Sequence, residues 1–277
     1  MRASPSPIAD RFPRAIGLEE LEAAAALQDR VDTKYLVSCD VFAALAERLS
    51  GTHSVLEIDC RRSFRYHTVY FDTEALTAYR DHMQRRRRRY KCRSREYVDS
   101  GVCTFEVKLK GLRGRTIKHR MAYDRARRDE LSEPALQFVR DCLERSYGRS
   151  PEGDLEPALA VTYARVTFAA PALGERVTCD FDLGFCAPSG AAGRLAEDTV
   201  IVESKSASGS AVADRALRAL GARPEGACSK YCLGVGLTNP RVNSNALRRL
   251  LRRHFRPGPG DNAGSRVSTG QAVRFAA

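Results

Sequence analysis

Tryptophan is absent from this chain of 277 residues, and no apolar run approaches the roughly 18 residues that a membrane-spanning helix requires. The N-terminus, which includes Pro5 and Pro7, lacks the apolar stretch of a secretory signal, so we expect a cytoplasmic protein. The nine cysteines form no CxxC pair. This spacing disfavours a zinc site or a disulfide framework and favours reduced, mostly buried thiols. The sequence also lacks a Walker loop, a Rossmann glycine pattern and a Ser-His-Asp grouping.

Positive charge is present in excess, but it is unevenly distributed. The formal net charge is +12, and residues 238–277 contribute eight arginines against the single acid Asp261. Residues 85–95 alone hold eight cations, namely Arg85–Arg89, Lys91, Arg93 and Arg95. A concentrated basic stretch in an otherwise nearly balanced body indicates a specific polyanion site more than a uniformly basic surface.

Two periods in the spacing of apolar residues distinguish the predicted strands from the predicted helices. A period of two predicts strands at 30–37, 63–72, 85–98, 102–110, 115–123, 157–168, 175–183 and 199–205. Helical spacing predicts helices at 18–27, 40–50, 134–147, 211–220 and 245–255, with a helical turn at 74–82. We expect residues 1–17 to be loose and residues 257–277 to be disordered, because both are rich in Pro, Gly or Ser.

Nearly every predicted strand has one apolar and one charged face. In residues 102–110, for example, Phe105 and Val107 alternate with Glu106 and Lys108. By the same alternation, Asp180 and Asp182 are predicted to share a face. Solvated sheet faces would explain any one such strand, but cations crowded on many strands require an anion to neutralise them. We therefore predict an α+β fold, in which an antiparallel β-barrel tunnel of about eight strands encloses the charged faces and helices pack outside.

Eight short motifs in order resemble the triphosphate tunnel metalloenzyme superfamily, specifically its polyphosphate-polymerase domain of the vacuolar transporter chaperone (VTC) type. The motifs span about residues 28–237. They are Arg30-x-Asp32-x-Lys34-Tyr35, Tyr70-Phe71-Asp72-Thr73, Arg89-x-Lys91-x-Arg93-x-Arg95-x-Tyr97, Phe105-Glu106-Val107-Lys108, Lys118-x-Arg120, Tyr163-x-Arg165, Glu203-x-Lys205 and Ser229-Lys230-Tyr231.

The resemblance implies a tunnel that binds triphosphates or polyphosphate with the help of Mg²⁺ or Mn²⁺. The expected catalytic residues are Lys230, Arg93, Arg95 and Arg165. The expected phosphate-binding residues are Lys34, Lys108, Lys118 and Tyr163, together with Lys91 and Arg120 of the same charged strands. The expected metal ligand is Glu203.

The first motif departs from the Glu-x-Glu-x-Lys pattern of the wider superfamily, because Arg30 and Asp32 replace its two acids. This departure disfavours a two-metal hydrolytic site and favours a polymerase that moves the γ-phosphoryl group of ATP onto inorganic polyphosphate. A tripolyphosphatase or nucleoside triphosphatase of the same fold remains one alternative, with Asp180 and Asp182 as candidate carboxylates. A non-catalytic module that binds polyphosphate or nucleic acid is another, although nucleic acid is the less expected partner.

The expected domain organisation has three parts. Residues 1–27 form an extension with a short helix, residues 28–237 form the tunnel domain, and residues 238–277 form a basic helix and a tail. The leucines of the basic helix are expected either to pack against the domain or to let the helix contact a membrane or another acidic partner.

Overall fold

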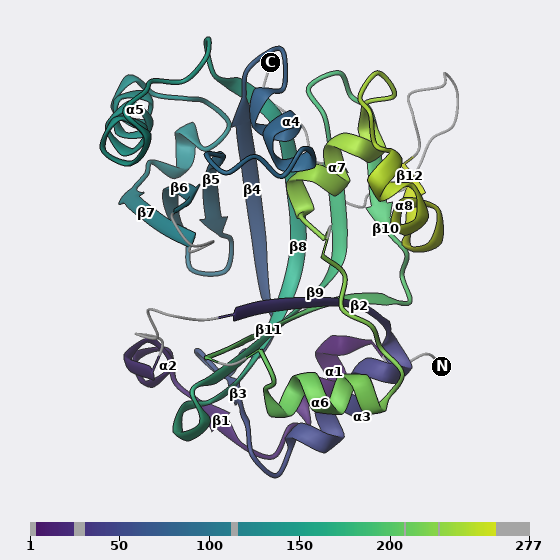
Figure 1. Cartoon of the computed structure of the whole chain (residues 1–277). Coiled ribbons are helices and arrows are strands. Elements are labelled where there is room, and N and C mark those ends of the chain that lie inside the picture. Colours follow the sequence, from purple (N-terminus) through teal and green to yellow (C-terminus); the bar gives the residue numbers. More distant parts are fainter. Residues whose placement is uncertain (1–3, 25–30, 112–115, 208, 227, 259–277) are drawn as a thin grey trace, which may run out of the picture. The chain divides into compact units, whose positions relative to one another are not determined.

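The computed structural model describes five stretches of the chain, namely 4–24, 31–111, 116–207, 209–226 and 228–258. Two compact units make up the chain (Figure 1). The first unit consists of Met1–Arg65, Tyr163–Leu183 and Leu195–Cys228. The second unit consists of Tyr66–Thr162, Gly184–Arg194 and Ser229–Ala277.

The first unit combines four helices with an antiparallel ladder. The helices are α1 (Pro5–Asp10), α2 (Leu18–Ala24), α3 (Cys39–Leu49) and α6 (Val212–Ala219). The strands are β1 (Ala15–Ile16), β2 (Val31–Ser38), β3 (Ser54–Leu56), β11 (Thr199–Ser206) and parts of β8 (Glu156–Ala170) and β9 (Glu175–Cys186), with a 3₁₀ turn at Pro171–Leu173. Strand β11 pairs antiparallel with both β2 and β9.

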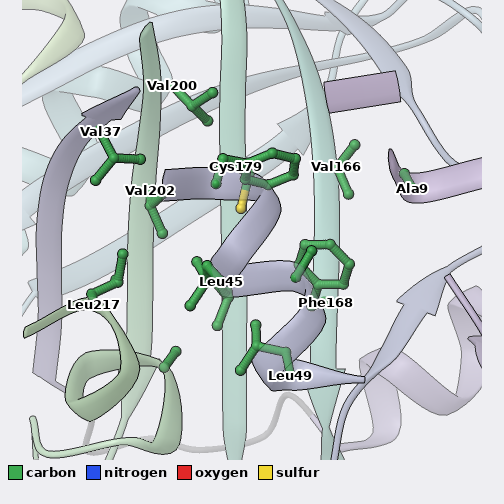
Figure 2. Packing of buried hydrophobic residues seen from close by; sticks show 14 of the residues in the cluster. Ala9, Val37, Leu45, Leu49, Val166, Phe168, Cys179, Val200, Val202 and Leu217 are labelled. Carbon is green, nitrogen blue, oxygen red and sulfur yellow. The ribbon is translucent and has the colours of Figure 1, made fainter. Parts of the chain in front are cut away.

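One face of this ladder is apolar and packs against α3 and α6. Figure 2 shows Leu45 of α3 and Leu217 of α6 beside Val202 of β11 and Cys179 of β9, all fully buried. Because strand side chains alternate, the residues between these apolar positions lie on the opposite face. The core therefore fixes which charged residues of β2, β9 and β11 share a surface.

The second unit contains a four-stranded antiparallel meander. Its meander strands are β4 (Phe64–Asp72), β5 (Tyr90–Tyr97), β6 (Val102–Lys110) and β7 (Thr116–Ala122), and the shorter strands are β10 (Ala192–Leu195) and β12 (Phe255–Pro257). Its helices are α4 (Thr77–Met83), α5 (Glu133–Tyr147), α7 (Lys230–Thr238) and α8 (Arg248–His254), with 3₁₀ turns at Arg125–Arg127 and Asn245–Leu247.

Helix α5 covers the apolar face of this meander. Val139 and Leu143 of α5 are fully buried in one cluster with Cys92, Phe105 and Val107 of the strands. The predicted helix 134–147 is thus confirmed. The sequence signals at its ends act as expected: the Ser132 side chain accepts a hydrogen bond from a first-turn amide, and Gly148 ends the helix with a φ of 64°.

The predicted α+β class is confirmed, because eight helices surround mainly antiparallel strands in the described residues. The main hydrogen-bonded order of the described strands is β12-β10-β9-β8-β4-β5-β6-β7. In this order β12 and β7 are the two end strands, so the backbone pairings of the sheet do not close into a ring. All nine cysteines are free and most are buried, as predicted. None of the described helices has the length and apolarity needed to span a membrane.

Two local predictions were wrong. The described part of segment 1–17, residues 4–17, includes α1, whose Ala9 is fully buried in the core of the first unit, so packing that the composition does not reveal orders this part. The predicted strand 85–98 begins only at Tyr90, because Arg85 adopts a left-handed φ of 55° that interrupts an extended chain. Arg30 of the first motif lies outside the described residues, as does most of the predicted disordered stretch 257–277, of which Pro257 ends β12.

The leucines of the basic C-terminal helix pack inside the second unit. Leu247 and Leu250 are buried, and Gly236 of α7 approaches Leu247 and Leu251 closely. The packing alternative for this helix is therefore confirmed, whereas a membrane or other acidic partner for its arginines stays a prediction.

Candidate functional site

The second unit carries a cationic sheet face on the side away from α5. We call it the β5–β7 face; it consists of Lys91, Arg93, Arg95, Glu106, Lys108, Lys118 and Arg120. The register places Arg93 opposite Glu106, and Lys108 lies between Lys91 and Lys118. One carboxylate thus faces six cations, so the face retains a strong positive charge.

Glu106 is the buried centre of the β5–β7 face. Its side chain is 1% exposed, and its Oε2 accepts hydrogen bonds from Nε and Nη2 of Arg93 at 2.7 and 2.5 Å. Lys118 Nζ pairs with the other oxygen, and Arg95 Nη1 lies 3.9 Å from Oε2. Burial alone would raise the pKa of Glu106, but these three cations outweigh it and hold the pKa far below its usual range. The sequence included Glu106 in a motif but gave it no role.

Lys118 is expected to link phosphate binding to proton uptake. Burial lowers the pKa of Lys118 to about 8, although Glu106 opposes the shift. A bound anion would favour the ammonium form, so triphosphate affinity should fall as pH rises from 7 to 9, and binding near pH 8 should take up part of a proton. Calorimetry in two buffers with different ionisation enthalpies measures that uptake.

Lys118→Arg is the matched variant for this measurement, because a guanidinium group keeps its proton throughout this pH range. The variant should bind triphosphate with little proton uptake and a flatter pH dependence. Equal uptake by the parent and Lys118→Arg would assign the proton to another group.

The N-terminus of α7 brings Lys230 to the β5–β7 face. The Tyr231 hydroxyl donates to Asp72 Oδ2 at 2.5 Å, and the Ser229 hydroxyl accepts from Lys91 Nζ at 2.7 Å. Burial would raise the pKa of Tyr70, but Arg93, Arg95, Lys91 and Lys230 together lower it, which places Lys230 within the same positive field.

Asp72 anchors this arrangement. Its carboxylate also accepts hydrogen bonds from the backbone amides of Thr73, Ala78 and Tyr79, so one buried group joins the end of β4, the start of α4 and the start of α7. Its place in the Tyr70–Thr73 motif was the only signal in the sequence. Asp72 positions Lys230 through Tyr231.

The first unit carries a second charged face on the side of its ladder away from α3. We call it the β2–β9 face; it consists of Asp32, Lys34, Tyr163, Arg165, Thr178, Asp180, Glu203 and Lys205. Within it, Glu203 Oε1 lies 2.6 Å from Lys34 Nζ, and Oε2 lies 2.8 Å from Lys205 Nζ. Burial would raise the pKa of Glu203, but the two lysines keep it well below its usual range.

The oxygen donors of the β2–β9 face suit a divalent cation that is shared with a phosphate. The ladder sets Lys34 opposite Glu203 and Asp32 opposite Lys205, so two carboxylates sit on neighbouring strands of one face. Magnesium is commonly held by one or two carboxylates together with substrate phosphates. No group of three or more His, Cys, Asp or Glu side chains in the described ranges could cage a metal by itself.

Arg165 is held in a fixed orientation by Asp180. Its Nε and Nη2 lie 2.5 and 2.9 Å from the two carboxylate oxygens, and its guanidinium lies over the Tyr163 ring at 5.4 Å. Asp180 is 1% exposed. The prediction that Asp182 shares this face was wrong, because Asp182 has a φ of 52° and an exposed side chain. A left-handed residue interrupts the strand alternation on which that prediction depended.

The predicted site residues fall into two groups, one in each unit. The β5–β7 face and its neighbouring α7 hold Lys91, Arg93, Arg95, Lys108, Lys118, Arg120 and Lys230. The β2–β9 face holds Lys34, Tyr163, Arg165 and Glu203. Both faces combine guanidinium or ammonium donors with buried carboxylates that orient them, which is a chemistry suited to phosphate oxygens.

A comparison with known sequence families identifies the family of this chain. The sequence model of the VTC domain matches residues 29–239, which is most of the chain, so the protein belongs to the VTC domain family. No curated protein matches the sequence.

Solved structures of low sequence identity are also similar. A proposed adenylyl cyclase from Hippeastrum, HpAC1, described as having a dominant triphosphatase activity, is 15% identical with a TM-score of 0.46, covering 75% of this chain and 94% of its own. A proposed adenylate cyclase from Bacillus halodurans is 14% identical with a TM-score of 0.42, covering 73% and 95%. A third, from Vibrio parahaemolyticus, is 17% identical with a TM-score of 0.39, covering 70% and 87%.

Proposed function

We propose that this VTC-domain protein is a metal-dependent phosphotransferase that moves the γ-phosphoryl group of ATP onto the end of an inorganic polyphosphate chain. In this step an oxygen of the chain terminus forms a bond to the γ-phosphorus. The bond from that phosphorus to the β–γ bridging oxygen breaks, and its electron pair stays on the ADP that leaves. The chain becomes one phosphate longer.

The observation that carries the proposal is that arginines of both faces are held by buried carboxylates. Arg93 is fixed by Glu106 and Arg165 by Asp180, so their donors are oriented before a ligand arrives. Phosphoryl transfer depends mainly on positioning and on stabilising charge at phosphate oxygens, and fixed donors do both without reorganising. We assign Arg93, Arg95, Arg165 and Lys230 to the reacting phosphates, and Lys34, Lys91, Lys108, Lys118, Arg120 and Tyr163 to binding the chain.

Glu203 is the proposed ligand of Mg²⁺ or Mn²⁺, with Asp32 as its neighbour. When bound, the cation would neutralise charge on phosphate oxygens. Glu203 stays ionised because Lys34 and Lys205 lower its pKa, so it can exchange an ammonium partner for a metal without losing a proton.

The carboxylates of the β2–β9 face favour a phosphate acceptor over water. A hydrolase needs a base to activate water, but both oxygens of Asp180 accept from Arg165. Burial raises the pKa of Asp182, but this carboxylate does not share the β2–β9 face. A chain terminus is already anionic near neutral pH and needs no base. Hydrolysis of triphosphate or nucleotide is the alternative activity.

Product analysis tests the direction of the chemistry. Purified protein incubated with γ-labelled ATP and Mn²⁺ or Mg²⁺ should convert ATP to ADP and labelled polyphosphate longer than any primer, and a short polyphosphate primer should shorten any lag. Orthophosphate or pyrophosphate as the sole labelled product would establish the hydrolase alternative, whereas tight polyphosphate binding without turnover would establish a non-catalytic module.

A further inference from the structure

A basic hollow lies in the second unit beside the start of β5. It has a volume of about 450 Å³ and is lined by Asp81, Arg86, Arg87, Arg88 and Arg149. This volume is within the range of pockets that bind small ligands. We call it the arginine hollow. None of its residues belongs to either charged face described above.

The backbone explains why these arginines leave the β5–β7 face. Arg85 has a φ of 55°, and the Arg86 amide donates to the Asp81 carbonyl, so the chain turns back toward α4 before β5 begins. Arg88 Nη1 donates to the Tyr147 carbonyl at 3.4 Å, and Arg149 Nη2 donates to the Arg88 carbonyl at 3.2 Å. The loop is thereby tied to the end of α5.

The charge of the arginine hollow is far from balanced. Asp81 is its only lining carboxylate, 3.3 Å from Arg86 Nε and 3.8 Å from Arg149 Nη2, and its side chain is 8% exposed. The exposed guanidinium of Arg87 makes no ion pair with a described residue. Arg149 also pairs with Glu152, which lies outside the lining, so four cations face two carboxylates and the hollow keeps a net positive charge that an anion would neutralise.

We propose that the arginine hollow is a second anion site, which binds a stretch of a linear phosphate chain whose neighbouring stretch lies on the β5–β7 face. The inference rests on the proposed function only for the identity of the ligand. Guanidinium groups recognise phosphate oxygens through paired hydrogen bonds, and a concave site of this size admits a thin flexible chain. Double-stranded nucleic acid is a broad rod whose phosphates are contacted from outside, so it fits the hollow less well.

Cations of the β5–β7 face act on a residue that is next to the arginine hollow in the chain. His82 follows Asp81 in the chain, and burial together with Lys91, Arg89 and Lys108 lowers its pKa to about 2. Only Arg89 and Tyr90 lie between Arg88 and Lys91, so the backbone span from Arg88 to Lys91 is at most about 11 Å. A phosphate chain that is bound at one site has a high effective concentration at the other, so a chain that occupies both sites binds more tightly. A ligand too short to reach both sites lacks this gain in affinity.

The test compares a long and a short phosphate ligand by calorimetry, without ATP or metal. Long-chain polyphosphate should bind the parent more tightly than tripolyphosphate. Arg87→Glu should lower the long-chain affinity about tenfold or more while changing the tripolyphosphate affinity little, because only the long chain uses both sites. Arg87→Lys should restore most of the long-chain affinity, because it restores the positive charge.

Arg127→Glu is the matched control, since it makes the same charge change at an exposed arginine of the same unit, whose only ion pair within the described stretches is with exposed Glu130. The proposal is overturned if Arg87→Glu and Arg127→Glu bind the long chain equally, or if Arg87→Glu weakens both ligands alike. It is also overturned if double-stranded DNA displaces the long chain from the parent but not from Arg87→Glu. The binding test measures no turnover. A hydrolase product in the ATP assay would therefore contradict the proposed phosphoryl transfer but not the second anion site.

Discussion

Glu203→Gln is expected to lower metal-dependent phosphoryl transfer by about 100-fold or more, because the variant loses the anion proposed to hold the cation. Metal-free triphosphate binding should persist or tighten, since Lys34 and Lys205 then keep their charge without a carboxylate between them. Turnover measured against metal concentration, alongside calorimetry without metal, separates the two effects. The lowered pKa of Glu203 keeps it ionised at neutral pH, so the difference should not depend on pH between about 6 and 8.

A purely structural ion pair would give the opposite pattern. The variant would then lose stability, as expected when a largely buried pair is broken, but the fully folded fraction would respond to metal as the parent does. Glu197→Gln is the control, because it removes an exposed carboxylate of the same unit that lies outside the β2–β9 face. It should leave both turnover and metal response unchanged.

Arg93→Ala and Arg95→Ala are each expected to weaken triphosphate binding by about 1.5–3 kcal/mol, the scale of a charge-assisted hydrogen bond. Their stabilities should differ. Arg93 makes two short bonds to buried Glu106, so its removal should also lower the free energy of unfolding. Arg95 lies 3.9 Å from the same carboxylate, and its removal should cost less stability.

Calorimetry with tripolyphosphate and urea unfolding of each variant provide the two measurements. Arg93→Lys is a useful intermediate, because it keeps the charge near Glu106 but loses the paired geometry of the guanidinium group. Parent-like triphosphate binding by both alanine variants would remove the β5–β7 face from the phosphate site.

The strand faces and their charge could be predicted from the order of residues alone. Alternation in residues 102–110 placed Phe105 and Val107 in the core and Glu106 and Lys108 on the other side, as the structure has them. The prediction succeeds because side chains in a strand alternate between two faces. Once one apolar residue is assigned to the core, the face of every other residue in the strand follows. The helix at 133–147 was predictable for a similar reason, since its capping serine and terminal glycine are local signals.

Which charged side chains become partners depends on how the strands and helices pack together. Glu106 holds Arg93 across one strand pair, whereas Asp72 meets Tyr231 across 159 residues of sequence. Such pairings depend on strand register and on helix docking, which composition does not encode locally. The run of five arginines illustrates the limit most clearly. Its alternation predicted a continuous strand, but the left-handed Arg85 and the hydrogen bonds of Arg88 and Arg149 to neighbouring carbonyls form a separate hollow.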